Sequence, residues 1–143
     1  MQELPHVYSV NAQSIDQGVR LSSLGLDEIL SAAPLEFGGP GDMWSPETLL
    51  AAAVADCFIL SFKAIARASK FDWTDISCEV EAVLDRVGRK TCFTEIRVLP
   101  CLSIANSVHM AKAKQLLEKS EAACLITNSM TANVVLNIKV IVV

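Results

Sequence analysis

Five cysteines are the side chains in this sequence with the greatest capacity for chemistry: Cys57, Cys78, Cys92, Cys101 and Cys124. A thiolate is a nucleophile, a metal ligand and a group that peroxides oxidise. The count is odd, no two cysteines are separated by only two residues, and only two histidines accompany them. This pattern predicts neither a disulfide framework nor a zinc site, and we expect no metal and no other cofactor. The remaining possibility is chemistry at the thiols themselves, as nucleophiles or as groups that peroxides oxidise.

Three of these cysteines are predicted to be structural. Cys78 belongs to the apolar face of an alternating segment, and Cys92 and Cys101 lie at or near the ends of the segment that follows. Buried thiols behave as small hydrophobic side chains. We therefore expect no chemistry from these three positions.

Cys57 and Cys124 have different surroundings. Cys57 lies in the middle of a long apolar segment next to Asp56, where periodicity alone favours ordinary core packing. Cys124 opens the short segment 124–129, and if that segment begins a helical turn, its free N–H groups would favour a thiolate there. From these residues alone, a reactive and a structural role stay open for both cysteines.

The apolar segment around Cys57 has the features of a long helix. Ser45 can cap free N–H groups, Pro46 suits the first helical position, and the acidic Glu47 favours the positive end of the helix dipole. We predict a helix from Pro46 to about Lys70. Its polar residues fall in a stripe only about 60° wide, so we expect the helix to be buried nearly all round. The residues of this stripe are Asp56, Lys63, Arg67 and Lys70.

The rest of the chain alternates between strand-like and helix-like periodicity. A glycine- and proline-rich stretch at 34–44 separates the first third from the long helix. The order predicts an α+β fold, with mainly antiparallel sheets packed around the long central helix, in a single domain over residues 1–143. The other predicted elements are strands at 6–12, 18–23 and 25–30, a hairpin of 73–85 and 91–99, a helix at 106–119, a turn or short helix at 122–130, and a closing strand at 134–142.

The composition favours a homodimer and excludes several classes of partner. Hydrophobic residues make up 52% of the chain, and the mean hydropathy is +0.40. A single domain of this size cannot bury so many apolar side chains, so we expect a second copy of the chain to cover the surplus. The net charge of −4, without a basic run, predicts neither nucleic acid nor a membrane surface as partner. The most apolar stretch, Leu49–Phe62, has 14 residues and is shorter than a membrane span. The first residues do not form a secretory signal, and we expect a cytoplasmic protein.

The segment Ser45–Phe58, Ser-Pro-Glu-Thr-Leu-Leu-Ala-Ala-Ala-Val-Ala-Asp-Cys-Phe, resembles the cysteine-bearing helix of the OsmC/Ohr family of thiol peroxidases. Family members carry the glutamate ten residues before the cysteine, as Glu47 and Cys57 are placed here. The glycines at 38–41 lie where the family has a glycine-rich approach to this helix. The family has a second cysteine at a similar spacing to the one seen here, where Cys124 lies 67 residues after Cys57. Asn128 matches the last position of the motif around that second cysteine. The resemblance extends over about residues 7–142.

The resemblance implies an OsmC-like fold, an intertwined homodimer and a cysteine-dependent peroxidase of the oxidative stress response. Cys57 would attack a hydroperoxide and become a sulfenic acid, and Cys124 would resolve it as a disulfide that an external dithiol, lipoyl or similar, reduces. An apolar pocket would favour organic peroxides over hydrogen peroxide, because an alkyl group gains from burial. The candidate pocket residues are Phe37, Met43, Trp44 and Phe58.

The sequence departs from the family pattern around this site. The arginine that pairs with the family's glutamate and steadies the thiolate aligns near Asp16, and the nearby Arg20 is the candidate to replace it. Leu125 stands where the family has proline. Ten residues of straight helix separate Glu47 from Cys57 by about 15 Å. Both reach one substrate only if the helix start bends back or Glu47 comes from a partner subunit, which again favours a homodimer with a shared site.

Two other functions stay open from the sequence. An OsmC-like module could bind an apolar ligand without catalysis, with its cysteines retained from the motif, and the displaced arginine favours this reading. A Cys–His hydrolase would pair Cys57 with His109, but His109 lies among polar residues and no Asn or Asp that would orient it is evident.

Overall fold

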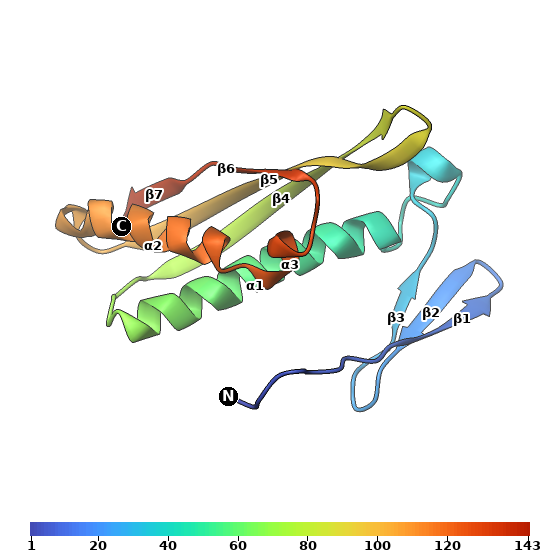
Figure 1. Cartoon of the computed structure of the whole chain (residues 1–143), viewed down its shortest axis with the longest axis horizontal. Helices are drawn as coiled ribbons and strands as arrows, with labels where there is room; N and C mark the ends of the chain where they lie inside the picture. Colours follow the sequence, from blue (N-terminus) through green and yellow to red (C-terminus); the bar gives the residue numbers. More distant parts are fainter. The chain divides into compact units, whose positions relative to one another are not determined.

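The computed structural model describes all 143 residues, and the chain divides into two compact units, Met1–Leu49 and Leu50–Val143. Each unit has its own β-sheet (Figure 1). The boundary falls within the first turn of the long helix α1 (Pro46–Ala68). A single domain over the whole chain therefore stays a prediction.

The first unit contains an antiparallel sheet of three short strands, β1 (Asn11–Ile15), β2 (Gly18–Ser22) and β3 (Ile29–Ser31). The predicted bounds of the first strand, 6–12, were wrong, because pairing with β2 begins only at Asn11. Gly18 has φ +134°, and a Cβ at this position would collide with the carbonyl oxygen of Ser31. Only glycine therefore allows β2 to start this close to β3.

The start of α1 is capped as the sequence predicts. The hydroxyl oxygen of Ser45 accepts a hydrogen bond from the backbone N–H of Thr48 at 3.1 Å, and the N–H of Ser45 donates to the hydroxyl of Thr48 at 2.8 Å. This reciprocal pair satisfies helix N–H groups that would otherwise lack a partner, and Ser45 is fully buried. The chain between β3 and α1 forms one 3₁₀ turn, Leu35–Phe37.

The second unit is built on a long antiparallel hairpin, β4 (Asp75–Val87) and β5 (Lys90–Ile104). Two short strands, β6 (Asn133–Leu136) and β7 (Lys139–Val142), pair with β5 in parallel. They keep one register, with Leu136 opposite Val98 and Lys139 opposite Cys101, so the break between them lies opposite Pro100. Proline has no N–H to donate to the ladder, which explains why the predicted closing strand is divided in two.

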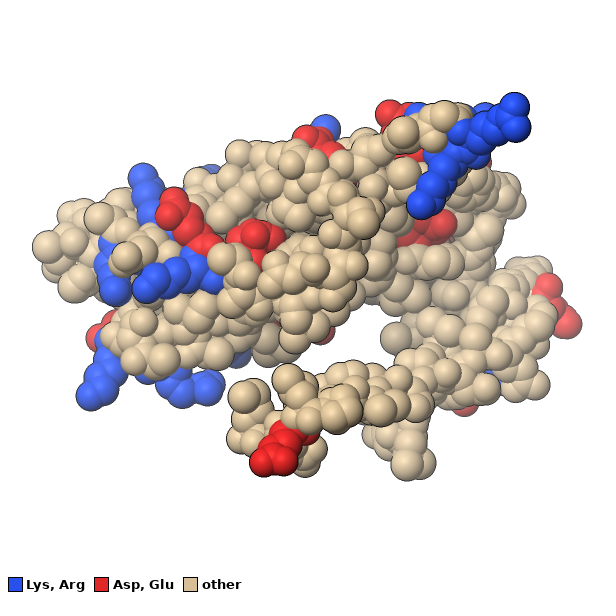
Figure 2. Space-filling view, in the orientation of Figure 1, with Lys and Arg blue, Asp and Glu red and all other residues tan.

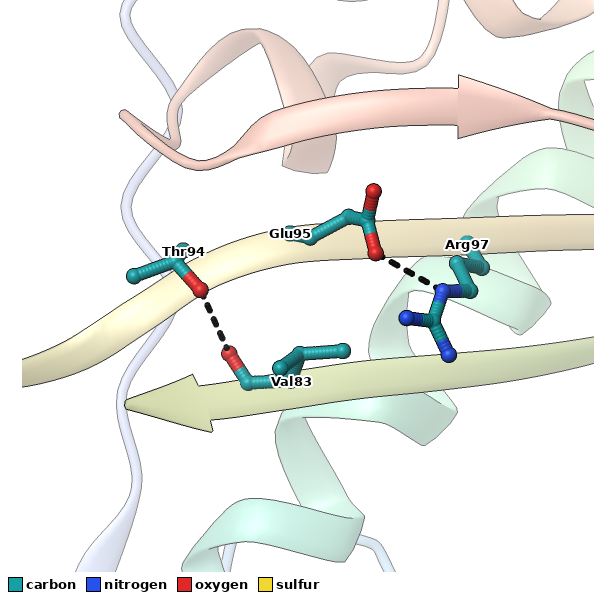
Figure 3. A network of polar contacts seen from close by, with 4 residues as sticks. All are labelled: Val83, Thr94, Glu95 and Arg97. Atoms are coloured by element: carbon teal, nitrogen blue, oxygen red, sulfur yellow. Dashed lines mark hydrogen bonds and ion pairs between the residues drawn. The ribbon is translucent and has the colours of Figure 1, made fainter. Parts of the chain in front are cut away.

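A bulge in the hairpin decides which side chains of β5 face inward. The register shifts between Val83 and Leu84, and Thr94 is the extra residue on β5. Its hydroxyl donates to the carbonyl oxygen of Val83 at 3.5 Å (Figure 3). Because the bulge changes the alternation, Phe93 packs against the core together with the buried Ile96.

The polar face of the same hairpin carries an ion pair. Arg97 Nε lies 2.7 Å from Glu95 Oε2 (Figure 3), and both side chains are partly exposed. Such a pair contributes little to stability, on the order of 1 kcal/mol or less. The stability of the second unit therefore rests on its apolar face.

Three helices complete the second unit: α1, α2 (Met110–Ala122), which follows a 3₁₀ turn at Ser107–His109, and the single turn α3 (Leu125–Asn128). One face of β5 shares a continuous core with α1 and α2, and Phe62 packs edge-on against Trp73 with ring centroids 5.6 Å apart. The predicted α+β class is confirmed. The buried core residues are Val54, Phe58, Phe62, Ala66, Ile96, Val98, Leu102, Ile104, Ala113, Leu116 and Leu117.

The prediction that α1 is buried nearly all round was wrong for the single chain. Only a stripe of every fourth residue, Val54, Phe58, Phe62 and Ala66, is buried, whereas Leu60 is 58% exposed. The other apolar faces are only partly covered within this chain. Figure 2 shows that charged side chains are sparse over the middle of α1, while basic ones gather over its C-terminal end and both basic and acidic ones lie over α2.

The apolar character of α1 also passes the simplest test for a membrane span. An 18-residue window has a mean hydropathy of 2.0, so by length and composition alone this helix could cross a membrane. The sequence argument from a 14-residue stretch was therefore too strict. The core helix of a soluble protein passes the same test, and the packed stripe of α1 agrees with that explanation.

Candidate active site

The structure brings the thiols of Cys57 and Cys124 together. Cys57 lies on α1, on the stripe beside the buried one, and Cys124 is the residue directly before α3. The two thiols interact, since the neighbouring Cys57 is one of the causes that raise the pKa of the Cys124 thiol. Both cysteines are free, and Cys124 is buried whereas Cys57 is partly exposed. The two cysteines are thus arranged as an accessible thiol with a second thiol behind it.

A cavity of about 450 Å³ opens beside Cys57, between α1 and α3. The α1 side consists mostly of small residues one helical turn apart, which leaves the space that the cavity occupies. Cys57 Sγ lies 4.0 Å from the hydroxyl oxygen of Ser61, the next residue on that stripe. The lining residues are Ala53, Asp56, Cys57, Leu60, Ser61, Ala64, Leu125 and Ile126.

Burial is the main reason why the pKa of the Cys124 thiol is raised. The backbone N–H and the hydroxyl of Thr127 oppose the shift by stabilising the thiolate, and the proximity of Cys57 adds to it. The expectation that helical N–H groups favour a thiolate at Cys124 is therefore met in direction, but burial outweighs them. At neutral pH Cys124 is held as a thiol, which suits a group that reacts second.

The other three cysteines stay outside this pair. Cys78 packs against the core on β4, where burial raises the pKa of its thiol to about 11, with a smaller contribution from Cys124. Cys92 and Cys101 both lie within β5 and are half-buried. Cys101 lines a separate cavity with Ser77 and Lys139. A structural role for these three residues stays a prediction.

Arg20 and Glu47 belong to the first unit. Arg20 lies on β2, and its Nε is 3.2 Å from Glu28 Oε2 in a partly exposed ion pair. Glu47 lies in the first turn of α1. Arg20 Nε and Glu47 Oε2 are the two buried side-chain polar atoms of the chain that lack a hydrogen-bond partner. The Glu28 carboxylate offsets part of the cost of burying Arg20 Nε, although the pair lacks the geometry of a hydrogen bond. Glu47 Oε2 has no partner, which is unfavourable unless another group meets it.

The predicted pocket residues are not gathered in one cavity. Phe58 belongs to the buried stripe of α1, is 1% exposed, and does not line the cavity beside Cys57, because neighbouring helical residues point about 100° apart. Met43 and Trp44 line a cavity of about 720 Å³ within the first unit, together with Leu30 and Thr48. Phe37 is exposed on the 3₁₀ turn of the same unit.

Sequence reasoning missed several residues of the site. Ser61 follows Cys57 by four positions, so helical periodicity could have placed it there. Thr127 lies three positions after Cys124, as a residue in the first turn after a helix cap does, which is a signal of the same kind. His109 packs edge-on against Phe71, with ring centroids 6.2 Å apart, and does not line the Cys57 cavity. Nothing in the geometry supports a Cys57–His109 hydrolase.

One thiol lies on a long helix and its neighbour lies directly before a short one, within an α+β fold. This arrangement places the chain in the class of thiol-bearing proteins. Residues 39–139 match the family model described as OsmC-like protein, and the chain therefore belongs to this family. The resemblance drawn from the helix motif is confirmed. The chain is also 26% identical over 131 residues to the uncharacterized protein YmaD of Bacillus subtilis (strain 168), an alignment that covers 88% of this chain and 81% of that protein.

Solved structures show the same fold. An organic hydroperoxide resistance protein OsmC from Legionella pneumophila, described as a predicted redox protein, is 25% identical, with 98% and 100% of the two chains covered and a TM-score of 0.78. An OsmC-like protein of unknown function from Vibrio cholerae is 18% identical, with 94% and 99% covered and a TM-score of 0.82. An organic hydroperoxide resistance protein from Elizabethkingia anophelis is 18% identical, with 98% and 100% covered and a TM-score of 0.77.

Thr127→Val tests the support that Thr127 gives to the Cys124 thiolate. Valine keeps the shape of threonine and removes the hydroxyl donor, so the pKa of Cys124 should rise further above its ordinary value. In a Cys57→Ser background, alkylation of Cys124 by iodoacetamide at pH 8 should slow by about threefold to tenfold, the worth of one hydrogen bond. Thr127→Ser, which keeps the hydroxyl, should react as the parent does. Equal rates for the valine and serine variants would contradict this role of the hydroxyl.

Proposed function

We propose that this protein is a thiol-dependent hydroperoxide reductase in which Cys57 is the peroxidatic cysteine and Cys124 the resolving one. The observation that carries the proposal is that Cys57 lines an apolar cavity together with Leu125 and Ile126, the residues that directly follow Cys124, so that the two thiols are neighbours. The family and the solved structures support a redox role, since relatives of the same fold are named organic hydroperoxide resistance proteins.

In the first step the Cys57 thiolate attacks the distal oxygen of the hydroperoxide. An S–O bond forms, the O–O bond breaks, and the departing alkoxide takes up a proton and leaves as an alcohol. Cys57 is oxidised to a sulfenic acid. The partly exposed position of Cys57 beside the cavity gives a substrate access to its sulfur.

In the second step the Cys124 sulfur attacks the Cys57 sulfenic acid. An S–S bond forms, the S–O bond breaks, and the hydroxide leaves as water with the proton from the Cys124 thiol. Because Cys57 is partly exposed beside the cavity whereas Cys124 is buried, the peroxide reaches Cys57 first. An external dithiol, lipoyl or similar, then reduces the Cys57–Cys124 disulfide through a mixed disulfide and returns both thiols.

The cavity favours organic peroxides over hydrogen peroxide. Leu60, Leu125 and Ile126 offer an apolar surface, and Leu60 and Leu125 are more than half exposed. An alkyl or aryl group that covers these side chains gains about 25 cal/mol for each Å² removed from water, whereas hydrogen peroxide gains none of this. We further propose that the enzyme acts in the cytoplasm.

A non-catalytic module that binds an apolar ligand is the alternative. It is favoured by one observation, that no cation lines the cavity beside Cys57 to stabilise its thiolate. Such a module would bind an apolar peroxide or alcohol without consuming it. Turnover assays therefore separate the two functions.

We propose that the functional unit is a homodimer with shared sites. Unsatisfied atoms on Arg20 and Glu47, and the exposed apolar faces of α1, support a partner subunit. Helical rise separates Glu47 from Cys57 by about 15 Å, so Glu47 of one copy would serve Cys57 of the other. Arg20 and Glu47 would then pair, and the guanidinium of Arg20 would offer N–H donors to the Cys57 thiolate, while the pair as a whole adds no net charge to the cavity.

Cys57→Ser should abolish catalysis. With cumene hydroperoxide and dihydrolipoamide, turnover should fall by about a thousandfold or more, because a serine hydroxyl is not a thiolate. Cys124→Ser should still reduce about one equivalent of peroxide per chain and then stop, because the sulfenic acid has no resolving thiol. Peroxide loss over time, measured with and without the dithiol, distinguishes the two variants.

Cys101→Ser is the matched control for these variants. Cys101 is a half-buried cysteine of the same unit that does not line the Cys57 cavity, so its loss should leave turnover unchanged. Wild-type protein that consumes no hydroperoxide with any dithiol would contradict the proposed function. Binding of cumene alcohol without consumption of the peroxide would favour the non-catalytic module.

Mixing Glu47→Gln chains with Cys57→Ser chains, each of which should be inactive alone, tests the shared site. If Glu47 of one copy serves Cys57 of the other, a mixed dimer of Glu47→Gln and Cys57→Ser chains contains one intact site. Refolding the two variants together in equal amounts should restore about one quarter of wild-type turnover, since half of the dimers are mixed and each has one good site. The control is Glu47→Gln refolded with the double variant Glu47→Gln/Cys57→Ser, since no dimer in that mixture contains an intact site. No recovery in mixtures whose mixed dimers are confirmed by native mass spectrometry, or a monomer of 15.4 kDa, would contradict the shared site.

A further inference from the structure

Asp56 is the one carboxylate that lines the cavity beside Cys57. It precedes Cys57 on α1, and its side chain is solvent-exposed and takes part in no ion pair or hydrogen bond. The other lining residues are uncharged apart from the thiol itself.

No basic side chain near Asp56 on α1 is placed to cancel its charge. The next basic residue along its stripe is Lys63, seven residues on, which corresponds to about 10 Å of helical rise. Leu125 and Ile126, which face the cavity from α3, are apolar. Glu121, at the end of α2, accepts a hydrogen bond from Thr127 at 2.8 Å and adds negative charge on that side rather than positive. Within one chain, the charge of Asp56 therefore has no basic partner among the residues that line the cavity.

We propose that Asp56 makes the Cys57 cavity selective for uncharged organic hydroperoxides and disfavours those that carry a carboxylate near the reacting group. The inference rests on the proposed function, because it concerns the substrate of the same site. Two like charges within a few ångströms repel, more strongly where apolar side chains exclude part of the water. An anionic substrate therefore meets Asp56 on its way to the sulfur, whereas a neutral alkyl or aryl hydroperoxide does not.

Alkylation of Cys57 with two matched reagents tests the charge selection without any peroxide. Iodoacetamide is neutral and iodoacetate is an anion, and both react with the same thiolate. The ratio of their rate constants cancels any change in the population of the Cys57 thiolate. Asp56→Asn should lower the iodoacetamide-to-iodoacetate ratio by about threefold to thirtyfold, the range expected for one unit charge close to the thiol. Peptide mass spectrometry assigns the labelled cysteine.

Asp72→Asn is the matched control, because Asp72 is an exposed aspartate of the same unit that does not line the cavity. It should leave the ratio at the wild-type value. High salt should lower the iodoacetamide-to-iodoacetate ratio of the wild type and leave that of Asp56→Asn unchanged, since ions screen the repulsion. A ratio that does not change in Asp56→Asn would overturn the proposal.

A second pair of probes extends the test to the reaction. Methyl linoleate hydroperoxide and linoleate hydroperoxide differ only in the charge of the head group. The wild type should prefer the ester in kcat/KM, and Asp56→Asn should reduce that preference. If the wild type and Asp56→Asn prefer the ester over the acid to the same degree, the substrate assignment is overturned. A changed alkylation ratio without consumption of either peroxide would instead overturn the proposed function and leave the charge selection of the cavity in place.

Discussion

Burial of a single stripe of α1 against the sheet fixes where both thiols lie in the second unit. Val54, Phe58, Phe62 and Ala66 occupy one side of the helix and join the core formed with β5 and α2. Burying each phenylalanine contributes about 1.5–3 kcal/mol, so a rotation of α1 that exposed them would be strongly unfavourable. The stripe beside them, which carries Cys57, must then face α3 and the residue before it, Cys124.

The same constraint explains the shape and the charge of the cavity. Small side chains on the Cys57 stripe leave room that the bulky core stripe does not, and Leu125 and Ile126 close it from α3. The two neighbouring cysteines differ in access, because Cys57 is partly exposed beside the cavity and Cys124 is buried, and this burial raises the pKa of the Cys124 thiol. Asp56, one position from Cys57, is turned to the same cavity by the helix and adds the charge that selects among substrates.

Part of this arrangement could be predicted from the sequence. The Ser45 cap and the switch to a two-residue period after α1 depend on neighbouring residues, and both were read correctly. The extent of burial of α1 was overestimated, because composition does not say which apolar faces have a neighbour. The division of the last strand depends on Pro100, which lies on another strand and is paired with it only in the folded sheet. The pairing of Cys57 with Cys124, 67 residues apart, came from the family resemblance and not from spacing.

Non-reducing peptide mapping shows whether Cys57 and Cys124 form one redox pair. Reduced wild-type protein would be treated with one equivalent of cumene hydroperoxide, digested and analysed by mass spectrometry. The account predicts one alcohol released per chain and a single new disulfide that joins the Cys57 and Cys124 peptides. An unmodified Cys57, or a disulfide that joins Cys57 to Cys78, Cys92 or Cys101 instead, would contradict it.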